Sequence, residues 1–234
     1  MIRTAVIGVG SMGRNHARVY SEIDSAALVG VADVNRDAAT GIARRYGGQA
    51  YGDYRRMLDE QHPQAVTVAV PTVDHCDVAL EVILRGINLL VEKPLAYTCK
   101  EGRRIIQAAR ERGVQLMVGH VERFNPAIIA LKRRLAGDAL GRIFQIDARR
   151  QGPFPARVRD VGVGIDLAVH DLDIIRYVTA SEIVRVYAET ERRIHSKYED
   201  LLNGMARLDD GAVATLTTNW LTPTKIRELA VIGE

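Results

Sequence analysis

The sequence predicts an α/β protein in two parts: a doubly wound parallel sheet, then an α+β region with a mostly antiparallel open sheet. In the first half, short apolar runs alternate with stretches of helical periodicity, which is the order typical of βαβ units. These runs are continuous, as in residues 65–70, and this indicates strands covered on both faces. After about residue 120 the pattern becomes rich in strands.

The first half is expected to contain five strands and four helices. The strands are predicted at residues 4–9, 28–33, 65–70, 88–92 and 115–119. The helices are predicted at residues 14–22, 36–46, 74–85 and 100–112. Thr98 and Glu101 have the spacing of a capping box at the start of the last helix, and Gly113 ends it.

The second half is expected to pack two helices on a sheet. The helices are predicted at residues 125–135 and 165–178, and a loop at 152–155. The strands are predicted at residues 143–150, 184–191, 202–208, 213–219 and 227–232. Asp209-Asp210-Gly211 predicts a hairpin turn. We therefore divide the chain into domains 1–121 and 122–234. Because the sequence stops directly after a strand, we expect a truncated sheet or an edge covered by another subunit.

Composition narrows the class of protein. Hydrophobic residues make up 47% and charged residues 26%, which are ordinary globular values. The net charge is only +3 and the arginines are interleaved with acids, which favours a solvated surface over a nucleic-acid interface. Cys76 and Cys99 lack a partner motif and suggest reduced thiols. No apolar run approaches the roughly 20 residues that span a bilayer, and no signal peptide is evident. We expect a cytoplasmic protein.

A glycine-rich loop follows the first predicted strand and precedes a helix. Such glycines allow a tight turn and let the backbone approach a pyrophosphate at the helix N-terminus. A glycine turn without a ligand is the alternative, which the surrounding pattern disfavours. The cofactor-binding candidates in this loop are Gly8, Gly10, Ser11, Met12 and Gly13.

An acid lies twenty residues beyond the loop. Asp33 ends the second predicted strand, where a carboxylate accepts hydrogen bonds from the ribose hydroxyls and repels a 2′-phosphate. The expected cofactor is therefore NAD rather than NADP, although Arg36 could soften the preference. Pro71 and His75 follow the strand at 65–70. His75 either lines the nicotinamide pocket or merely caps or packs a helix start.

The segment Glu92-Lys93-Pro94 closes an apolar strand at the same edge of the sheet. The chain has only five lysines against 27 arginines. A lysine at this position therefore suggests a need for an ammonium, which is a compact donor whose pKa can be tuned. An ordinary surface lysine is the alternative. Glu92 is a further candidate for cofactor binding.

A second group of candidates lies on the helix predicted at 165–178. Asp166 and His170 are four residues apart and share a helical face, whereas Asp171 and Asp173 fall on other faces. A carboxylate beside an imidazole fixes its tautomer and raises its basicity, as a general base requires. On spacing alone, a structural histidine beside an aspartate on the helix surface is as well supported as a catalytic pair. No third ligand has sensible spacing, so we expect no metal site.

Together these motifs resemble the glucose–fructose oxidoreductase/inositol dehydrogenase (Gfo/Idh/MocA) family along essentially the whole chain. The elements that carry the resemblance are residues 8–13 with His16, Pro71-Thr72-x-x-His75, Glu92-Lys93-Pro94 and Gly164-x-Asp166-x-x-x-His170-Asp171. The resemblance implies that Lys93 hydrogen-bonds the reacting hydroxyl, that His170 is the acid/base, and that Asp166 lies beside it. The family's C-terminal sheet normally continues beyond the point where this sequence ends.

Residues 118–127 resemble a narrower branch of that family, which oxidises nucleotide-linked amino sugars and includes UDP-N-acetylglucosamine 3-dehydrogenases. In such a protein His120, Arg123 and Asn125 would bind substrate. Arg123 suits a phosphate or carboxylate through a bidentate contact. The alternative is that this stretch only links the two domains.

The predicted function is NAD-dependent oxidation of a ring secondary hydroxyl, with UDP-N-acetylglucosamine and its 3-position as the leading substrate and site. A free-polyol dehydrogenase, such as an inositol dehydrogenase, is the second candidate. A non-catalytic NAD-binding regulator of the same fold is the third, because fold does not fix function. We expect a small-molecule sugar substrate and a homo-oligomer formed through the C-terminal sheet, with no nucleic-acid or membrane partner.

Overall fold

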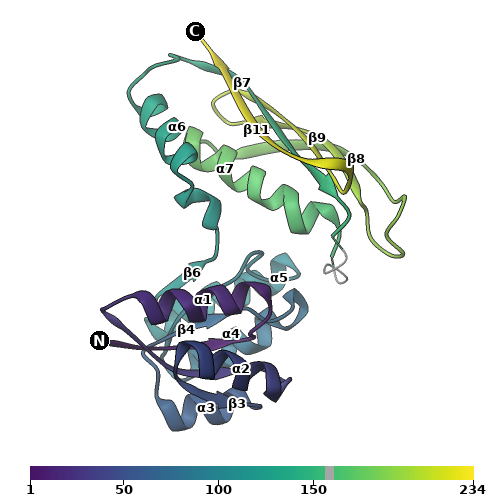
Figure 1. The fold of residues 1–234 in the computed structure, drawn as a ribbon. Helices are drawn as coiled ribbons and strands as arrows, with labels where there is room; N and C mark the ends of the chain where they lie inside the picture. The colour runs from purple at the N-terminus through teal and green to yellow at the C-terminus, as the bar shows by residue number, and fades with distance from the viewer. Residues whose placement is uncertain (156–160) are drawn as a thin grey trace. The chain divides into compact units, whose positions relative to one another are not determined.

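A computed structural model describes residues 1–155 and 161–234 of the chain (Figure 1). It divides into two compact units, Met1–Gly119 and His120–Glu234, and each has its own sheet and core. None of the helices in the described residues is long and apolar enough to cross a membrane.

The first unit is a six-stranded parallel sheet in the order β3-β2-β1-β4-β5-β6. The predicted doubly wound sheet is thereby confirmed. The strands are β1 (Ile2–Ile7), β2 (Ala26–Ala32), β3 (Gln49–Tyr51), β4 (Ala65–Val68), β5 (Asn88–Val91) and β6 (Leu116–Val118). The helices are α1 (Ser11–Glu22), α2 (Arg36–Tyr46), α3 (Tyr54–Gln61), η1 (Thr72–Asp74), α4 (His75–Leu84) and α5 (Cys99–Arg112).

Both faces of this sheet are covered by apolar side chains. In β1, Val6 belongs to a core with residues of α1 and α2, whereas Ile7 belongs to the core under α4 and α5. Neighbouring residues of a strand point to opposite faces. Val6 and Ile7 are both at most 2% exposed, so both faces of the strand are buried. This explains why the apolar runs are continuous rather than alternating. Each such side chain contributes about 1.5–3 kcal/mol through burial.

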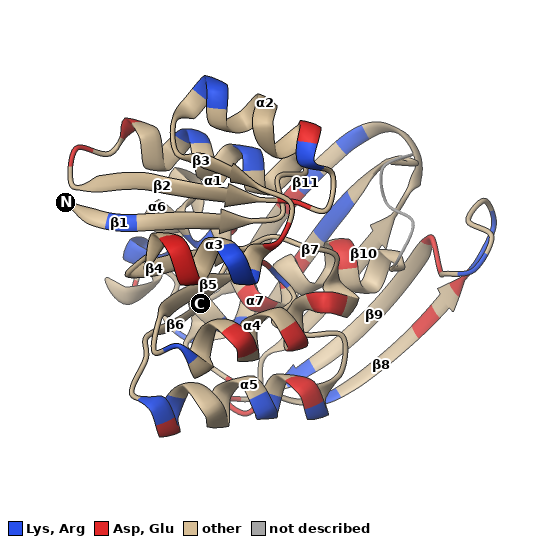
Figure 2. Ribbon diagram, turned by 90° about the horizontal axis from the view of Figure 1, so that it is seen from below, with Lys and Arg blue, Asp and Glu red and all other residues tan. Residues whose placement is uncertain are grey.

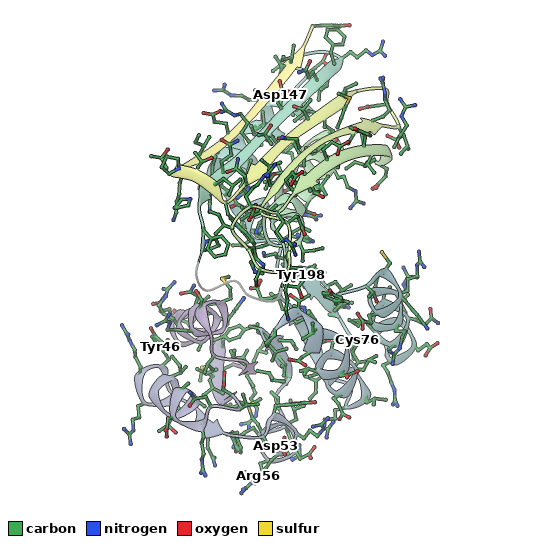
Figure 3. All side chains as sticks on the ribbon, turned by 90° about the vertical axis from the view of Figure 1, so that its right-hand side faces the viewer. Tyr46, Asp53, Arg56, Cys76, Asp147 and Tyr198 are labelled. Atoms are coloured by element: carbon green, nitrogen blue, oxygen red, sulfur yellow. The ribbon has the colours of Figure 1, made fainter. Side chains whose placement is uncertain are left out.

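The sequence did not predict β3 and α3. β3 has only three residues, and the helix that follows is strongly polar. In α3 only Met57 and Leu58 are buried. Asp53 caps this helix by accepting a hydrogen bond from the Arg55 N–H, and Figure 3 shows Arg56 at the outer surface.

The second unit is a five-stranded sheet in the order β11-β7-β10-β9-β8, in which only the pairing of β10 with β7 is parallel. The strands are β7 (Ile143–Pro153), β8 (Ile183–Glu191), β9 (Leu201–Leu208), β10 (Val213–Asn219) and β11 (Leu221–Gly233). The helical segments are η2 (Val121–Phe124), α6 (Pro126–Ala136), a π-helical turn (Gly164–Ala168) and α7 (Val169–Thr179). In Figure 1, α6 and α7 cover the same face of the sheet.

Two local predictions for this unit differ from the structure in detail. The loop expected at 152–155 begins later, because β7 continues through Gly152 to Pro153, which pairs with Leu221 of β11. The helix expected from residue 165 opens with a π-helical turn rather than α-helix. The predicted hairpin joins β9 to β10, and Gly211 supplies its positive φ of 94°.

Charged residues of both signs are spread along the helices of the first unit. Figure 2 shows basic and acidic positions interleaved on α5, where Lys100 and Arg103 flank Glu101. An interleaved pattern is typical of a solvated helix face.

Candidate functional site

The glycine-rich loop joins β1 to α1. Gly8 has a φ of 86°, and a Cβ there would lie 2.6 Å from the Ala69 carbonyl oxygen. A Cβ on Gly13 would lie 1.8 Å from the carbonyl oxygen of Gly8. These two glycines are therefore required by the close packing of the loop on its own helix and on the chain after β4. Gly10 differs, because no atom of residues 1–155 or 161–234 is found within 4 Å of the position its Cβ would take.

The open side of Gly10 faces a cavity of about 670 Å³, a size in the usual range for a small-molecule site. Gly10 is also the N-cap of α1, and among the residues that the structure describes no side chain caps this helix. The first N–H groups of α1, at Ser11, Met12 and Gly13, are thus left to an anion, as at a pyrophosphate site. The cavity lining includes Gly8, Gly10, Asp33, Val34, Tyr54 and Pro71.

Asp33 lies where the cavity meets the end of β2. Its Oδ2 accepts a hydrogen bond from the Val9 N–H at 2.8 Å, and its Oδ1 accepts one from the Asn35 N–H at 2.9 Å. A carboxylate has about four acceptor positions, so it retains capacity for ribose hydroxyls. Arg36 is the first residue of α2 and is exposed. The residues present therefore fit NAD.

Lys93 follows β5 at the carboxyl edge of the sheet, the same edge that carries Gly8, Asp33 and Pro71 after β1, β2 and β4. Ligands of doubly wound sheets bind at this edge. The side chain is half-buried, and the Lys93–Pro94 peptide bond is cis. A half-buried ammonium at this edge can donate hydrogen bonds to a substrate oxygen.

Two predicted cofactor ligands, His75 and Glu92, make contacts within the protein on either side of Lys93. His75 is 1% exposed, and its Nδ1 lies 2.8 Å from the Pro94 carbonyl oxygen and its Nε2 3.0 Å from that of Val70. Glu92 Oε1 lies 2.6 Å from the Nε2 of His16 in α1. Neither lines the cavity beside Gly10, and their contact with the cofactor stays a prediction.

Asp166 and His170 lie in the second unit, on consecutive segments of one helical stretch. Asp166 is in the π-helical turn and is 9% exposed, whereas His170 is in α7 and half-buried. A π-turn winds more widely than an α-turn, so the predicted i, i+4 geometry does not apply strictly. π-turns occur frequently at functional sites, which is consistent with a catalytic role for both residues.

The two acidic residues that follow His170, Asp171 and Asp173, each accept hydrogen bonds from an arginine. The Arg150 guanidinium donates to both Asp171 oxygens at 2.9–3.0 Å, and also to Glu122 at 3.1 Å. Burial raises the pKa of Asp171, against the opposing effect of Arg150. Arg123 donates two hydrogen bonds to Asp173, at 2.8 and 2.5 Å. These pairs anchor η2 to α7 and β7.

The remaining predicted substrate ligands lie close to these pairs. His120 Nδ1 is 3.6 Å from Asp173 Oδ2. The side chain of Asn125 caps α6 by accepting a hydrogen bond from the Ala127 N–H at 3.0 Å. Since Arg123 already has a carboxylate partner, its binding of a substrate phosphate stays a prediction.

Two residues near the candidate site were not singled out as site residues by the sequence. His16 lies three residues past Gly13 in α1, and its only sequence signal was its place in the resemblance. Glu199 accepts a hydrogen bond from the Gly164 N–H at 3.1 Å, at the start of the π-turn that carries Asp166. A Cβ on Gly162 would lie 2.1 Å from the Glu199 carboxyl carbon, and this explains the glycines before Asp166.

Comparison with known families and proteins places the whole chain among oxidoreductases. Residues 2–120 match the family described as "Oxidoreductase family, NAD-binding Rossmann fold". Residues 128–234 match the "GFO/IDH/MocA C-terminal domain". The first unit is therefore an NAD-binding Rossmann domain.

Two relatives are similar over most of the chain. UDP-N-acetylglucosamine 3-dehydrogenase from Acidithiobacillus ferrooxidans is 34% identical over 233 residues, which are 100% of this chain and 72% of that enzyme. The scyllo-inositol 2-dehydrogenase (NAD(+)) from Bacillus subtilis is 32% identical over 191 residues, or 79% of this chain and 56% of that enzyme. The chain thus spans little more than half the length of the second relative.

Solved structures show the same architecture. The A. ferrooxidans enzyme superposes with a TM-score of 0.89 at 31% identity, covering 100% of this chain and 72% of the other. The WlbA dehydrogenase from Bordetella pertussis, in complex with NADH and UDP-GlcNAcA, gives a TM-score of 0.91 at 25% identity, covering 100% and 76%.

Proposed function

The chain belongs to the Gfo/Idh/MocA oxidoreductase family, and from that premise we propose that it oxidises a ring secondary hydroxyl of a sugar with NAD. The observation that carries this proposal is Lys93, the half-buried lysine at the sheet edge that bears the NAD-binding loop. The leading substrate is a nucleotide sugar such as UDP-N-acetylglucosamine, oxidised at its 3-position. This choice of substrate is supported by the similarity of the chain, over its full length, to the A. ferrooxidans enzyme.

NAD, when bound, supplies a nicotinamide ring that accepts a hydride. The chain's own residues hold the cofactor and handle the proton. The N–H groups at the start of α1 bind the pyrophosphate, with Gly10 leaving room for its approach. Asp33 accepts hydrogen bonds from the ribose hydroxyls and repels a 2′-phosphate.

We assign a separate role in the oxidation of the hydroxyl to each of three side chains. Lys93 donates a hydrogen bond to the hydroxyl oxygen and stabilises the negative charge that develops there. His170 accepts the proton at its imidazole, and Asp166 orients that ring. General-base catalysis of this kind typically contributes about 10²–10⁴-fold in rate.

Oxidation of a free cyclic polyol is the second candidate, supported by the similarity of the B. subtilis scyllo-inositol enzyme. The two candidates differ in whether the site binds a nucleotide. Protection of the chain from thermal unfolding by UDP supports the nucleotide-sugar reading. Protection by myo-inositol without any effect of UDP supports the polyol reading.

We further propose a homo-oligomer formed through the open face of the second sheet. On this face Asp147 (Figure 3) and its neighbours point away from α7, because they alternate with the buried Ile146 and Ala148. The face also carries Tyr187 and Met205, which are 66% and 54% exposed. Light scattering coupled to size-exclusion chromatography tests the proposed homo-oligomer. A mass of more than one chain is expected, and a monomer at micromolar concentration contradicts the proposal.

A further inference from the structure

The residue before Lys93 has a partner in a distant helix. Glu92 Oε1 and His16 Nε2 are 2.6 Å apart, and their side chains are 9% and 21% exposed. Hydrogen bonds to a charged group are short and roughly twice as strong as neutral ones. The pair therefore ties the end of β5 to the second turn of α1, the helix that begins at the cofactor loop.

The Glu92 carboxylate is confined on a second side by Gly119, which follows β6. A Cβ on Gly119 would lie 2.9 Å from Glu92 Oε2 and 3.0 Å from its carboxyl carbon. Gly119 itself is held by its N–H, which donates to the Val91 carbonyl oxygen at 2.8 Å. Glycine at 119 thus leaves the space that the carboxylate fills.

The residue after Lys93 is also held by a histidine. The Pro94 carbonyl oxygen lies 2.8 Å from Nδ1 of the buried His75. Lys93 therefore sits between two fixed neighbours, Glu92 against His16 and Pro94 against His75. The backbone from which the ammonium projects is set by these contacts rather than by a regular element, because β5 ends at Val91.

We propose that His16 and Glu92 form a positioning pair for Lys93, which fixes the turn that carries the amine. This inference rests on the proposed role of Lys93 for its functional meaning. The proposal explains why a glutamate precedes the lysine without requiring Glu92 to contact the cofactor. Loss of either partner frees the turn while the cofactor cavity keeps its lining.

The reactivity of the Lys93 amine reports on the turn without any substrate. The chain has only five lysines, so each can be followed by mass spectrometry after labelling with trinitrobenzenesulfonate. His16→Ala and Glu92→Ala are each expected to raise the labelling rate of half-buried Lys93 by about tenfold, as expected for loss of one charge-assisted hydrogen bond. Exposed Lys100 on α5 is the internal control, and its rate should not change.

The double variant distinguishes a pair from two independent residues. If His16 and Glu92 act together, the doubly substituted protein labels at the rate of either single variant. Glu92→Gln and His16→Asn keep a hydrogen-bonding group and should give a smaller rise. Arg18→Ala, which breaks the exposed Arg18–Glu22 pair on the same helix, should leave the Lys93 rate unchanged.

An unchanged Lys93 rate in the single variants overturns the proposal, and so does an equal rise at Lys100, which signals general loosening. If the alanine variants fail to fold, the same comparison between Lys93 and Lys100 is made on Glu92→Gln, where any rise must be confined to Lys93. The catalytic role is tested separately. If Lys93→Ala still oxidises the sugar while the His16 and Glu92 variants show the expected labelling of Lys93, the proposed function fails and the positioning pair stands.

Discussion

Asp173 accepts two hydrogen bonds from the guanidinium of Arg123, at 2.8 and 2.5 Å, fifty residues away along the chain. Asp173 is only 6% exposed, so the pair joins η2 to α7 through a largely buried carboxylate. The fork geometry that suits arginine to a substrate phosphate is here used within the protein.

Arg123→Ala should lower the free energy of unfolding by about 2 kcal/mol, because it removes the bidentate partner of a buried carboxylate. Urea unfolding measures the loss. Arg176→Ala breaks a pair with Glu182 in which both side chains are well exposed, and it should cost less than about 0.5 kcal/mol. Equal losses in the two variants would contradict the structural role of Arg123.

Gly13→Ala and Gly41→Ala place the same methyl group in two helices with opposite expected results. At Gly13 the Cβ would meet a backbone oxygen at 1.8 Å, whereas at Gly41 in α2 no atom of the described part of the chain lies within 4 Å. We expect Gly13→Ala to destabilise the first unit and abolish NAD binding. Gly41→Ala should stabilise the protein by about 0.5–1 kcal/mol. Thermal unfolding with and without NAD checks both, and retained NAD binding in Gly13→Ala refutes the loop geometry.

Asp33→Ala should weaken NAD binding by about tenfold or more, since it removes acceptors for the ribose and the anchor of the Val9 N–H. Binding of NADP should weaken less, because the repulsion of a 2′-phosphate is also removed. Titration of protein fluorescence with each cofactor measures the ratio. Asp37→Ala, at an exposed position in the first turn of α2, is the control, and a similar effect there would rule out a specific role for Asp33.

Asp200 is fully buried and accepts hydrogen bonds from three successive backbone N–H groups, at residues 193–195. Burial alone would raise the pKa of Asp200, but these backbone hydrogen bonds outweigh it and hold the pKa below its usual value. Because its pKa is lowered in the folded state, the ionised carboxylate stabilises the protein at pH values above the unfolded pKa of about 3.9. This stabilisation is lost as the pH falls through the pKa of the folded state.

Asp200→Asn should therefore destabilise the protein at pH 7, and the difference from the unsubstituted chain should shrink as the pH falls below about 4. Urea unfolding across this range measures it. Asp24→Asn, at an exposed position, should show no such trend. A difference that stays constant with pH contradicts the role of the ionised carboxylate.

Much of the fold could be predicted because its strands are short apolar runs separated by clear caps. α2 was predicted with its observed bounds, and the capping box of Thr98 and Glu101 is present. β3 could not be predicted, because three residues carry no measurable periodicity. The π-turn at Gly164–Ala168 could not be predicted either, because apolar spacing does not distinguish five residues of π-helix from α-helix.

The sequence motifs of the candidate site could be predicted, but the hydrogen-bond partners of its side chains could not. The glycine loop and Asp33 have a fixed spacing, and the structure places them around one cavity. The partners of Glu92 and Arg123 lie 76 and 50 residues away. Such pairs depend on tertiary packing, which local patterns do not encode. Asn125 illustrates the same limit, since an N-cap and a substrate ligand use the same side-chain type.

The most direct test of the central claim is the appearance of NADH absorbance when the protein is mixed with NAD and UDP-N-acetylglucosamine. Myo-inositol and UDP alone serve as parallel reactions, and Lys93→Ala as the matched variant. The account predicts NADH formation with the nucleotide sugar, and loss of turnover in Lys93→Ala with NAD binding retained. NAD binding without NADH formation from either UDP-N-acetylglucosamine or myo-inositol, or undiminished turnover in Lys93→Ala, would contradict it.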